Sequence, residues 1–441
     1  MIQELRNYSE VIDMAEMKDS GIEWVGKIPE NWKVLKNKYN FELSKEIIGT
    51  KWVETQLLSL TKYGVKAIND GEQTGKVPES LSTYQKVNKD DIVMCLFDLD
   101  CSAVFSGISN FDGMISPAYK CIRCKPHLCP QYVDYYFRTV FVDRKYKRYS
   151  KNVRFSISSD EFMNLPIIVP PIDIQKKIAE FLNFKCFEID TLHSDIEKQI
   201  KTLEEYKKSI ITEAVTKGLD PDVEMKDSGI SYIGNIPKHW KVTNLKYLGK
   251  CQNGISKGGE YFGNGFPFVS YGDVYKNYSI PQNVDGLIMS TKTEQNIYSV
   301  KYGDVFFTRT SETIEEIGFA STCLKSIDNS VFAGFLIRFR PTSSDLIPEF
   351  SKFYFRSNIH RKFFVKEMNL VTRASLSQNL LGRLPVLLPP LCEQQMIAKN
   401  LEKKCAEIDG AIEEKKEQLE TLEQYKKSLI YEYVTGKKEV K

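Results

Sequence analysis

The chain has 441 residues, a length typical of two or three domains. Its composition of 42% apolar and 27% charged residues suits globular domains with sizeable cores, and no run approaches the roughly 18 apolar residues of a membrane span. The net charge of +3, from 61 basic and 58 acidic residues, does not by itself indicate a nucleic-acid partner. Four histidines leave little room for histidine-rich metal or acid–base chemistry.

The N-terminal segment, residues 1–16, carries four acids and has no apolar stretch, so we do not expect a secretory signal. Ten cysteines in a long chain without such a signal predict reduced thiols. The sequence therefore predicts a cytoplasmic protein.

A repeat covers the whole chain. Residues 17–34 return at 225–242 with 12 of 18 positions identical, and residues 165–190 return at 384–409. The similarity continues from 202–216 to 421–435, whereas the middles, roughly 35–164 and 243–383, resemble each other only in patches. Duplication with divergent middles suggests one scaffold that carries two different recognition surfaces.

The divergent middles predict a mixed α+β fold, because short apolar and aromatic runs alternate with glycine-rich turns. Strands are expected at 91–97, 118–123, 266–270, 304–308 and 335–339, and helices at 132–141 and 349–366.

Each repeat ends in a long predicted helix that begins after a Pro-Pro pair, at 170–171 and 389–390. Apolar residues recur at alternating steps of four and three over about five heptads, as in a coiled-coil seam. The seam has polar interruptions at His193, Lys207, Lys415 and Lys426. Because a globular domain separates the two helices, we expect them to pair antiparallel, which gives the fold an internal pseudo-twofold repeat. Two unrelated surface helices are the alternative.

Enzyme signatures are weak. Residues 71–77 fall one residue short of a phosphate-binding loop and lack Ser or Thr after Lys76. No dinucleotide-binding, methyltransferase or magnesium-nuclease motif is found. Cys121, Cys124, His127 and Cys129 have the spacing of zinc ligands, but the matching stretch 335–341 has none, which favours buried thiols. The sequence thus predicts no catalytic residue, no metal and no cofactor bound by this chain.

Basic residues concentrate in two matching stretches. Residues 120–154 hold ten Lys or Arg against two acids, and residues 338–373 hold eight against three. Both stretches interleave Tyr and Phe and end in an Arg-x-Ser-x-Ser pattern. A basic, aromatic segment that recurs at one place in both repeats predicts a surface that follows DNA phosphates. A solvated helix face is the alternative.

At this point the chain resembles the specificity (S) subunits of type I restriction–modification systems. The resemblance rests on Ser-Gly-Ile-x-x-x-Gly-x-Ile-Pro-x-x-Trp at 20–32 and 228–240, on Leu-Pro-x-x-x-Pro-Pro with Gln-x-x-Ile-Ala at 165–179 and 384–398, and on residues 113–119. One departure is Ile174 before Gln175, where the family has Glu, as at Glu393. The resemblance implies target-recognition domains at 1–170 and 218–389, a central conserved helix at 171–217 and a C-terminal conserved helix at 390–441.

The resemblance also implies a function. Each recognition domain would read one half of a bipartite asymmetric site in double-stranded DNA, and the helix pair would set the spacer. The helices would dock two modification (methyltransferase) subunits, which bring S-adenosylmethionine. Restriction subunits, with ATP and Mg²⁺, would join that core. The chain itself would have no catalytic activity.

We expect two groups of site residues. The predicted DNA-binding residues are Arg154, Ser156, Ser158, Arg373, Ser375, Ser377, Arg309, Lys62, Tyr63, Ser270 and Tyr271. The predicted partner-binding helices are centred on Leu182, Ile189, Ile196, Leu203, Leu401, Ile408, Leu422 and Leu429.

Two other functions remain open from the sequence. One is a coiled-coil scaffold that binds proteins, and the other is the specificity chain of a different restriction architecture, with a fused nuclease–methyltransferase as its partner. The neighbouring genes would discriminate between them.

Overall fold

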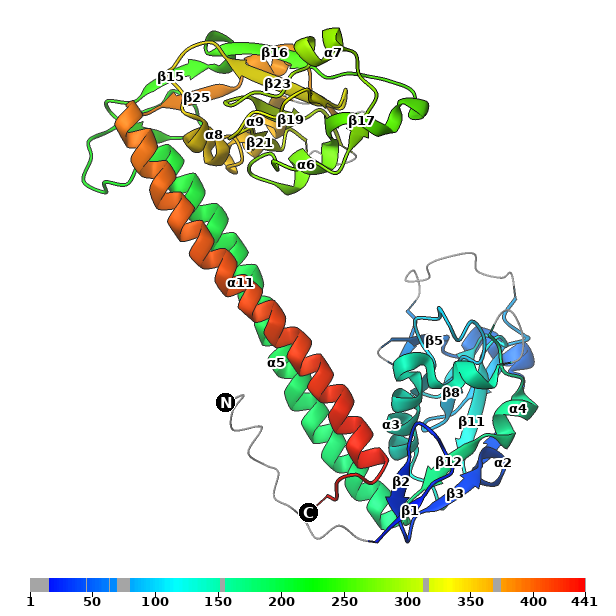
Figure 1. Cartoon of the computed structure of the whole chain (residues 1–441). Coiled ribbons are helices and arrows are strands. Elements are labelled where there is room, and N and C mark those ends of the chain that lie inside the picture. Colours follow the sequence, from blue (N-terminus) through cyan, green and yellow to red (C-terminus); the bar gives the residue numbers. More distant parts are fainter. Residues whose placement is uncertain are drawn as a thin grey trace. The chain divides into compact units, whose positions relative to one another are not determined.

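The computed structural model describes residues 16–44, 46–62, 64–69, 80–150, 155–311, 317–367 and 374–440. The chain divides into two compact units, Met1–Ile196 with Glu417–Lys441 and Glu197–Lys416. Each unit therefore contains one α/β domain and one end of each of two long helices, α5 (Ile172–Lys217) and α11 (Leu391–Val434) (Figure 1).

The first unit is built from short strands and helices that precede α5. Its elements are β1 (Met17–Asp19), β2 (Lys27–Pro29), β3 (Lys33–Lys36), α2 (Asn37–Asn40), β4 (Phe41–Leu43), η1 (Gly49–Glu54), β5 (Leu58–Thr61), β6 (Gly64–Ala67), β7 (Gln85–Val87), β8 (Ile92–Met94), β9 (Ser106–Ile108), β10 (Gly113–Ile115), β11 (Lys120–Cys124), α3 (Pro130–Phe141), η2 (Val142–Tyr149), α4 (Ser159–Asn164) and β12 (Pro166–Val169).

The second unit follows α5. Its elements are β13 (Met225–Asp227), β14 (Asn235–Pro237), β15 (Lys241–Asn244), η3 (Leu245–Tyr247), β16 (Gly249–Asn253), η4 (Gly259–Tyr261), β17 (Phe262–Val269), α6 (Tyr271–Lys276), β18 (Leu287–Ile288), α7 (Lys292–Ile297), β19 (Val305–Thr308), β20 (Thr310–Ser311), β21 (Ala320–Thr322), β22 (Val331–Phe332), β23 (Leu336–Pro341), α8 (Pro348–Tyr354), α9 (Ile359–Glu367), β24 (Ala374–Ser375), α10 (Gln378–Gly382) and β25 (Pro385–Leu388).

The two domains share one sheet topology. The four-stranded antiparallel sheet has the order β4-β11-β8-β9 in the first and β16-β23-β19-β21 in the second. Each domain also pairs the strand after its entry hairpin with the strand before its long helix, β3 with β12 and β15 with β25. The second domain adds a three-stranded sheet, β18-β17-β22. These shared sheets confirm the predicted mixed α+β fold and its duplication.

Each central sheet is buried on both faces. In the first domain Ile92 and Met94 face the cluster that contains Tyr136 of α3, whereas Val93 faces a second cluster with Leu58. The alternation follows from the two-residue period of a strand. In the second domain Phe307 and Phe306 divide between two clusters in the same way.

A buried glutamine fixes the start of each long helix to its domain. Gln175 Nε2 donates to the carbonyls of Pro170 at 2.8 Å and His127 at 3.1 Å, and its Oε1 accepts from Cys129 N at 2.8 Å. Gln394 makes the same three bonds, to Pro389 O at 2.9 Å, Asp345 O at 2.7 Å and from Ile347 N at 3.0 Å. The Pro-Pro and Gln motif therefore aims the helix, because every polar atom of the buried amide is satisfied.

The long helices pair antiparallel, as predicted. Lys207 contacts Asp409 and Lys415 contacts Gln199 in the second unit, while Lys426 contacts Asp190 in the first. Residue numbers rise along one helix as they fall along the other. The predicted polar interruptions are thus cross-helix contacts rather than defects in the seam.

Each entry hairpin packs against the end of a long helix from the other repeat. Gly436 has φ +71°, and a Cβ there would lie 2.4 Å from Pro29 Cδ. Gly218 has φ +79°, and its Cβ would lie 3.4 Å from Trp240. Both helices therefore need a residue without a side chain where they turn away from the domain.

Candidate nucleic-acid interface

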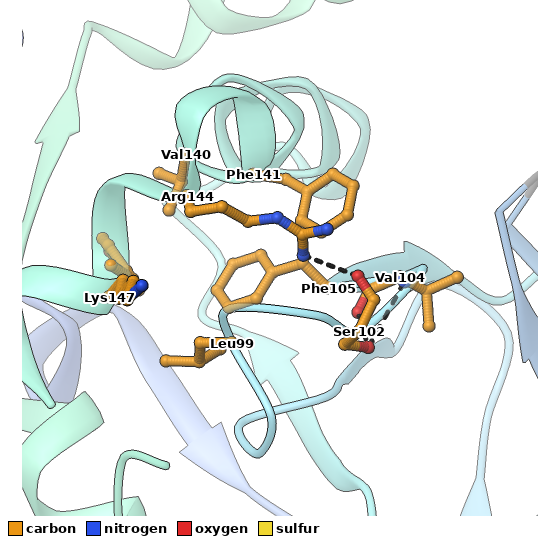
Figure 2. A pocket seen from close by; sticks show the side chains of 9 residues that line it. Leu99, Ser102, Val104, Phe105, Val140, Phe141, Arg144 and Lys147 are labelled. Atoms are coloured by element: carbon orange, nitrogen blue, oxygen red, sulfur yellow. Dashed lines mark hydrogen bonds between the residues drawn. The ribbon is translucent and has the colours of Figure 1, made fainter. Parts of the chain in front are cut away.

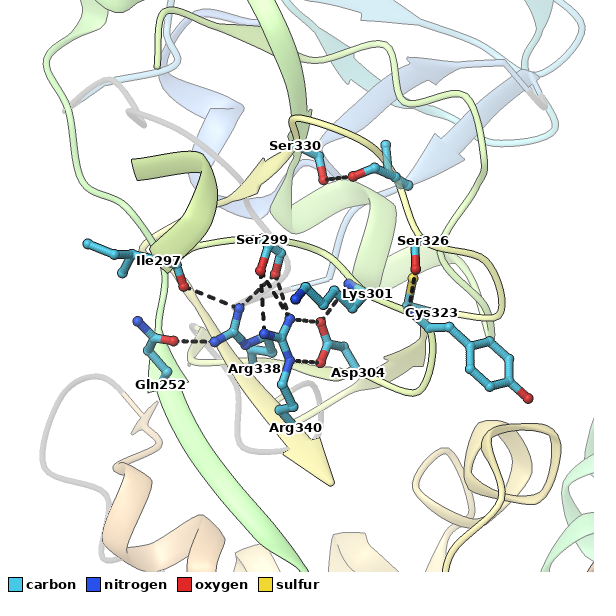
Figure 3. Close-up of polar contacts among 12 residues, drawn as sticks. Gln252, Ile297, Ser299, Lys301, Asp304, Cys323, Ser326, Ser330, Arg338 and Arg340 are labelled. Carbon is cyan, nitrogen blue, oxygen red and sulfur yellow. Dashed lines mark hydrogen bonds and ion pairs between the residues drawn. The ribbon is translucent and has the colours of Figure 1, made fainter. Parts of the chain in front are cut away.

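A buried aspartate at the start of the central strand organises each domain. Asp91 Oδ1 and Oδ2 accept from Nε and Nη2 of Arg123 at 3.0 and 3.1 Å, and Oδ2 also accepts from Asn88 N at 2.9 Å. Asp304 repeats the arrangement, with Arg340 at 2.6 Å on both oxygens and Lys301 N at 2.7 Å (Figure 3). A buried carboxylate requires such donors, so these arginines hold the sheet together.

The second domain places a further arginine beside this pair. Arg338 is buried, donates from Nη1 to Ser299 O at 2.7 Å, and hydrogen-bonds Gln252 (Figure 3). Burial lowers the pKa of Arg338 to about 10. The first domain has Cys121 at the corresponding position of β11, so this cation belongs to the second domain alone.

Most arginines of the second basic stretch point inward. Arg356 donates to the carbonyls of Val274 and Tyr275 at 3.2 and 2.6 Å, and Arg361 donates to Ile317 O. Together with Arg338 and Arg340, they satisfy buried carbonyl or carboxylate oxygens. The prediction of a phosphate-following surface is therefore wrong for these residues, because sequence density of charge does not show which way a side chain points.

The Arg-x-Ser-x-Ser segments lie at matching places. Arg154 and Arg373 fall outside the described residues. Ser158 caps α4 by accepting from Glu161 N at 3.2 Å, and Ser377 caps α10 by accepting from Leu380 N at 3.1 Å. The last serine of each pattern thus has a structural role at a helix N-terminus, and its contact with DNA stays a prediction.

The same segments are anchored next to the end of the central strand. Ile157 N donates to Leu96 O at 2.8 Å, and Leu376 N donates to Arg309 O at 2.8 Å. In the second domain this brings Arg309 and Ser375 to adjacent strands, since Thr310 pairs with Ser375. In the first domain Ser156 lies beside the anchored Ile157, and its carbonyl accepts from Ser150 Oγ at 3.2 Å.

The remaining predicted DNA contacts lie elsewhere. Ser270 caps α6 through Asp273 N at 3.3 Å, and Tyr271 stacks on Tyr275 with ring centroids 5.9 Å apart. Lys62 is exposed in the turn between β5 and β6, and Tyr63 falls outside the described residues. The structure does not join these residues to the Arg-x-Ser-x-Ser segments.

One arginine that the sequence did not single out is held at the surface of the first domain. The Arg144 guanidinium carbon lies 4.5 Å from the centroid of the Phe141 ring, and Nη1 donates to Ser102 O at 2.5 Å (Figure 2). The cavity beside it is about 10 Å³, enough for no more than one water molecule. Arg144 is therefore positioned as a contact group on a surface and does not line a ligand pocket.

Backbone strain gathers around Arg144. Asp98, Arg144 and Phe155 have left-handed φ values of 51°, 53° and 45°. Leu99 N donates to Phe155 O at 3.1 Å, which ties two of these strained segments together. For residues with a side chain this conformation costs about 1 kcal/mol or more, and it gathers at functional sites. The three strained positions were the only structural signal for this surface, and a sequence does not display φ.

The cysteines with zinc-like spacing are separated by the sheet. Cys121 belongs to the cluster around Leu58, whereas Cys124 packs on the cluster at the opposite face. Burial raises the pKa of each of these two thiols to about 12. His127 lies 3.0 Å from Asn40 Oδ1. Neutral thiols on opposite faces are core residues, in agreement with the interpretation favoured from the sequence.

The predicted partner-binding residues lie along the seam of the helix pair. Five are buried and three are partly buried: Leu182, Ile189, Leu401, Ile408 and Leu429, then Ile196, Leu203 and Leu422. These side chains serve helix pairing. The helix faces left for a partner are the exposed ones, which include Phe184 and Phe187 on α5.

No helix in the described part of the chain is long and apolar enough to cross a membrane. A family model for the type I restriction modification DNA specificity domain matches residues 29–204 and 237–421.

Curated relatives match over most of their length. The putative type I restriction enzyme MjaX specificity subunit of Methanocaldococcus jannaschii is 26% identical, with 95% of this chain and 96% of the relative covered. The type I restriction enzyme EcoKI specificity subunit of Escherichia coli K12 is 24% identical, with 87% and 84% covered.

Solved structures share the fold. The HsdS subunit from Thermoanaerobacter tengcongensis aligns with a TM-score of 0.52 at 14% identity, over 93% of this chain and 98% of its own. A chain from work on complex assembly and conformational transition of the type I R-M system aligns with a TM-score of 0.69 at 12% identity, over 92% and 98%.

Proposed function

The chain belongs to the family of type I restriction–modification DNA specificity domains, and from that premise we propose that it is the DNA sequence-recognition subunit of such a complex. Each of its two domains reads one half of a bipartite, asymmetric site in double-stranded DNA. The observation that carries the proposal is a duplicated scaffold with different surfaces. The Asp–Arg pair, the buried glutamine and the sheet order recur, whereas Arg144 and Arg338 occur in one domain each.

The proposed DNA contacts combine groups from the sequence and from the structure. In the first domain they are Arg144 and Lys147, together with Arg154, Ser156 and Ser158. In the second they are Arg309, Ser375 and Ser377 together with Arg373. Lys62, Tyr63, Ser270 and Tyr271 are secondary candidates. Guanidinium groups can read guanine edges or bind phosphate, and hydroxyls can do either.

We further propose that the chain itself is not catalytic. Its partners would be two modification subunits, which bring S-adenosylmethionine, and restriction subunits that use ATP and Mg²⁺. The duplicated helix pair supports two docking surfaces, since each unit contains one end of both helices. The protein would act in the cytoplasm, where the genomic DNA lies.

Methylome sequencing tests this function. Cells that express the modification subunit alone and cells that also express this chain would be compared. We expect one bipartite N6-methyladenine motif that requires the chain. A control that replaces Gln175 and Gln394 with Leu would remove the helix anchors and abolish the motif. Absence of any chain-dependent motif, with the complex assembled, would contradict the proposal.

A further inference from the structure

The two ends of the helix pair are packed differently, although the chain is a repeat. In the first unit Phe181 of α5 and Tyr433 of α11 lie with ring centroids 4.5 Å apart, against the main core. Repeat alignment places Asn400 and Ala214 at these positions in the second unit. A pair of aromatic side chains is thus replaced by an amide and a methyl group.

The second unit has a cavity where those side chains would be. It measures about 590 Å³, and both Asn400 and Ala214 line it. Leu401 and Ile210 form apolar walls beside them, and Leu219 of the segment after α5 is 45% exposed. The counterpart of Ile210 in the first unit, Leu429, is buried, whereas Ile210 is only partly buried. Apolar surface that one repeat covers is open to solvent in the other.

Charged groups surround this apolar floor. Lys217, Lys404, Glu213 and Asp220 also line the cavity. Lys217 Nζ lies 4.0 Å from Glu213 Oε1, so one pair of opposite charges stands at the edge. A second cavity of about 380 Å³ shares Lys217 and Gly218 with the first and adds Met396 and Ile397 as apolar lining. An apolar floor with a charged edge is the arrangement of a pocket that receives one anchoring side chain of a protein partner.

We propose that the cavity between Ala214 and Asn400 is a docking pocket for an aromatic side chain of one modification subunit. The first repeat shows which chemistry the site accepts, because its own Phe181 and Tyr433 occupy the equivalent space. The pocket exists once in the chain, so the two modification subunits dock on non-equivalent surfaces. The inference rests on the proposed function, which supplies the partner.

The test transfers the packing of the first unit into the second. The double variant Ala214→Tyr with Asn400→Phe fills the pocket from within, and the helices keep their seam residues. A matched control, Lys208→Tyr with Lys399→Phe, adds the same side chains to the same helices at exposed positions that do not line the pocket. Thermal unfolding of all three proteins establishes that the filled variant remains folded.

Stepwise binding of the modification subunit is then measured by native mass spectrometry and titration calorimetry. The wild type and the control should bind two copies. The filled variant should bind the first copy normally and the second at least about tenfold more weakly, as expected when a central aromatic anchor is lost. Equal affinity for both copies in the filled variant would overturn the proposal, as would equal weakening in the control.

A second probe separates this inference from the proposed function. p-Cresol, the side-chain analogue of tyrosine, should give saturable shifts of the Ala214 and Ile233 methyl resonances in the full-length chain, and none in the filled variant. If the wild type binds no modification subunit, the proposed function fails. If it binds two copies while p-cresol leaves both methyl groups unchanged, only the pocket is disproved.

Discussion

Lys207 Nζ donates to both carboxylate oxygens of Asp409, at 2.7 and 2.6 Å, from the middle of a seam otherwise made of apolar residues. The repeat carries the same pair in the other unit, where Lys426 Nζ lies 2.6 and 2.7 Å from the oxygens of Asp190. A polar pair at a seam position satisfies itself in one alignment of the helices only. These two pairs therefore specify the register and the antiparallel direction of the helices.

Charge reversal tests this register. Lys207→Glu should place two carboxylates together and lower the stability of the helix pair by about 1 kcal/mol, since the site is partly exposed. The charge swap of Lys207→Asp with Asp409→Lys should recover most of that loss. Thermal unfolding followed by circular dichroism measures both effects.

The same comparison in high salt supplies the control. Screening should shrink the difference between wild type and Lys207→Glu, because the Asp409 carboxylate is largely exposed. A swap variant that unfolds at the same temperature as the single reversal would show that the pair does not set the register.

Protonation of a buried histidine gives a pH prediction. His360 is buried, its Nε2 donates to Tyr354 O at 2.8 Å, and burial lowers its pKa to about 3. The unfolded chain binds this proton below about pH 6.5 and the folded chain does not, so stability is full above pH 6.5 and falls as the pH drops toward 3. Lowering the pH from 7 to 5 should cost about 2 kcal/mol through this residue.

The variant His360→Asn isolates the effect. It removes the titrating group, so its free energy of unfolding should fall by about 2 kcal/mol less than that of the wild type between pH 7 and 5. Urea unfolding at both pH values measures the difference. Parallel pH profiles would mean that His360 is protonated in the folded chain.

The sequence contained the duplication, the helix pair and the strand positions, because these depend on period and repetition. It did not contain the direction of the arginines. Asp91 and Asp304 both precede an apolar strand, and Arg123 and Arg340 both lie on a later one, so their recurrence was visible. Their pairing was not, because it depends on β8 lying next to β11 and β19 next to β23.

The candidate DNA surface was less predictable for the same reason. Arg144 is one of several basic residues in its stretch, and the sequence does not distinguish it from Arg123. What separates them is contact: Arg123 meets a buried carboxylate, whereas Arg144 stacks on Phe141 at the surface. The left-handed φ of Arg144 is imposed by tertiary packing, which local sequence does not encode.

Replacement of Arg144 tests whether it reads DNA. Arg144→Ala should weaken specific binding by about 1–3 kcal/mol if the guanidinium contacts a base edge. The loss should affect one half-site only, and random DNA should bind as before. Arg148→Ala is the control, because Arg148 lies in the same helix η2 and pairs with the exposed Glu23. Equal weakening on cognate and random DNA would assign Arg144 to a phosphate.

The predicted residue Arg373 is tested in the same assay. Arg373→Ala should cost about 1–3 kcal/mol for a base contact, or reduce the salt dependence of binding for a phosphate contact. Competition on fluorescent duplexes at two salt concentrations distinguishes the two. Unchanged affinity on both cognate and random DNA would remove Arg373 from the interface.

Circular permutation tests how the chain ends are arranged. Tyr431 Oη donates to Trp24 O at 3.1 Å, and Gly436 packs on Pro29, so the end of α11 meets the first entry hairpin within one unit. The segment after α5 meets the second hairpin at Trp240 in the same manner. Joining Lys441 to Met1 and opening the chain between Asp220 and Asp222 should give a folded chain that directs the same methylation motif. Aggregation of the permutant alone would contradict this arrangement.

The length of the helix pair should set the spacer between the two half-sites. Gln199 of α5 lies opposite Lys415 of α11, so four residues inserted after each of them lengthen both helices together. Each insert adds about 6 Å of helix and a rotation of about 40°, so the seam stays close to register. At about 3.4 Å per base pair, the spacer should grow by one to two base pairs while both half-sites stay the same. Two residues inserted at each place would rotate the seam by about 200° and should abolish methylation. The methylated motif in cells that express each variant is the measurement, and an active four-residue variant with an unchanged spacer would show that the helices do not determine it.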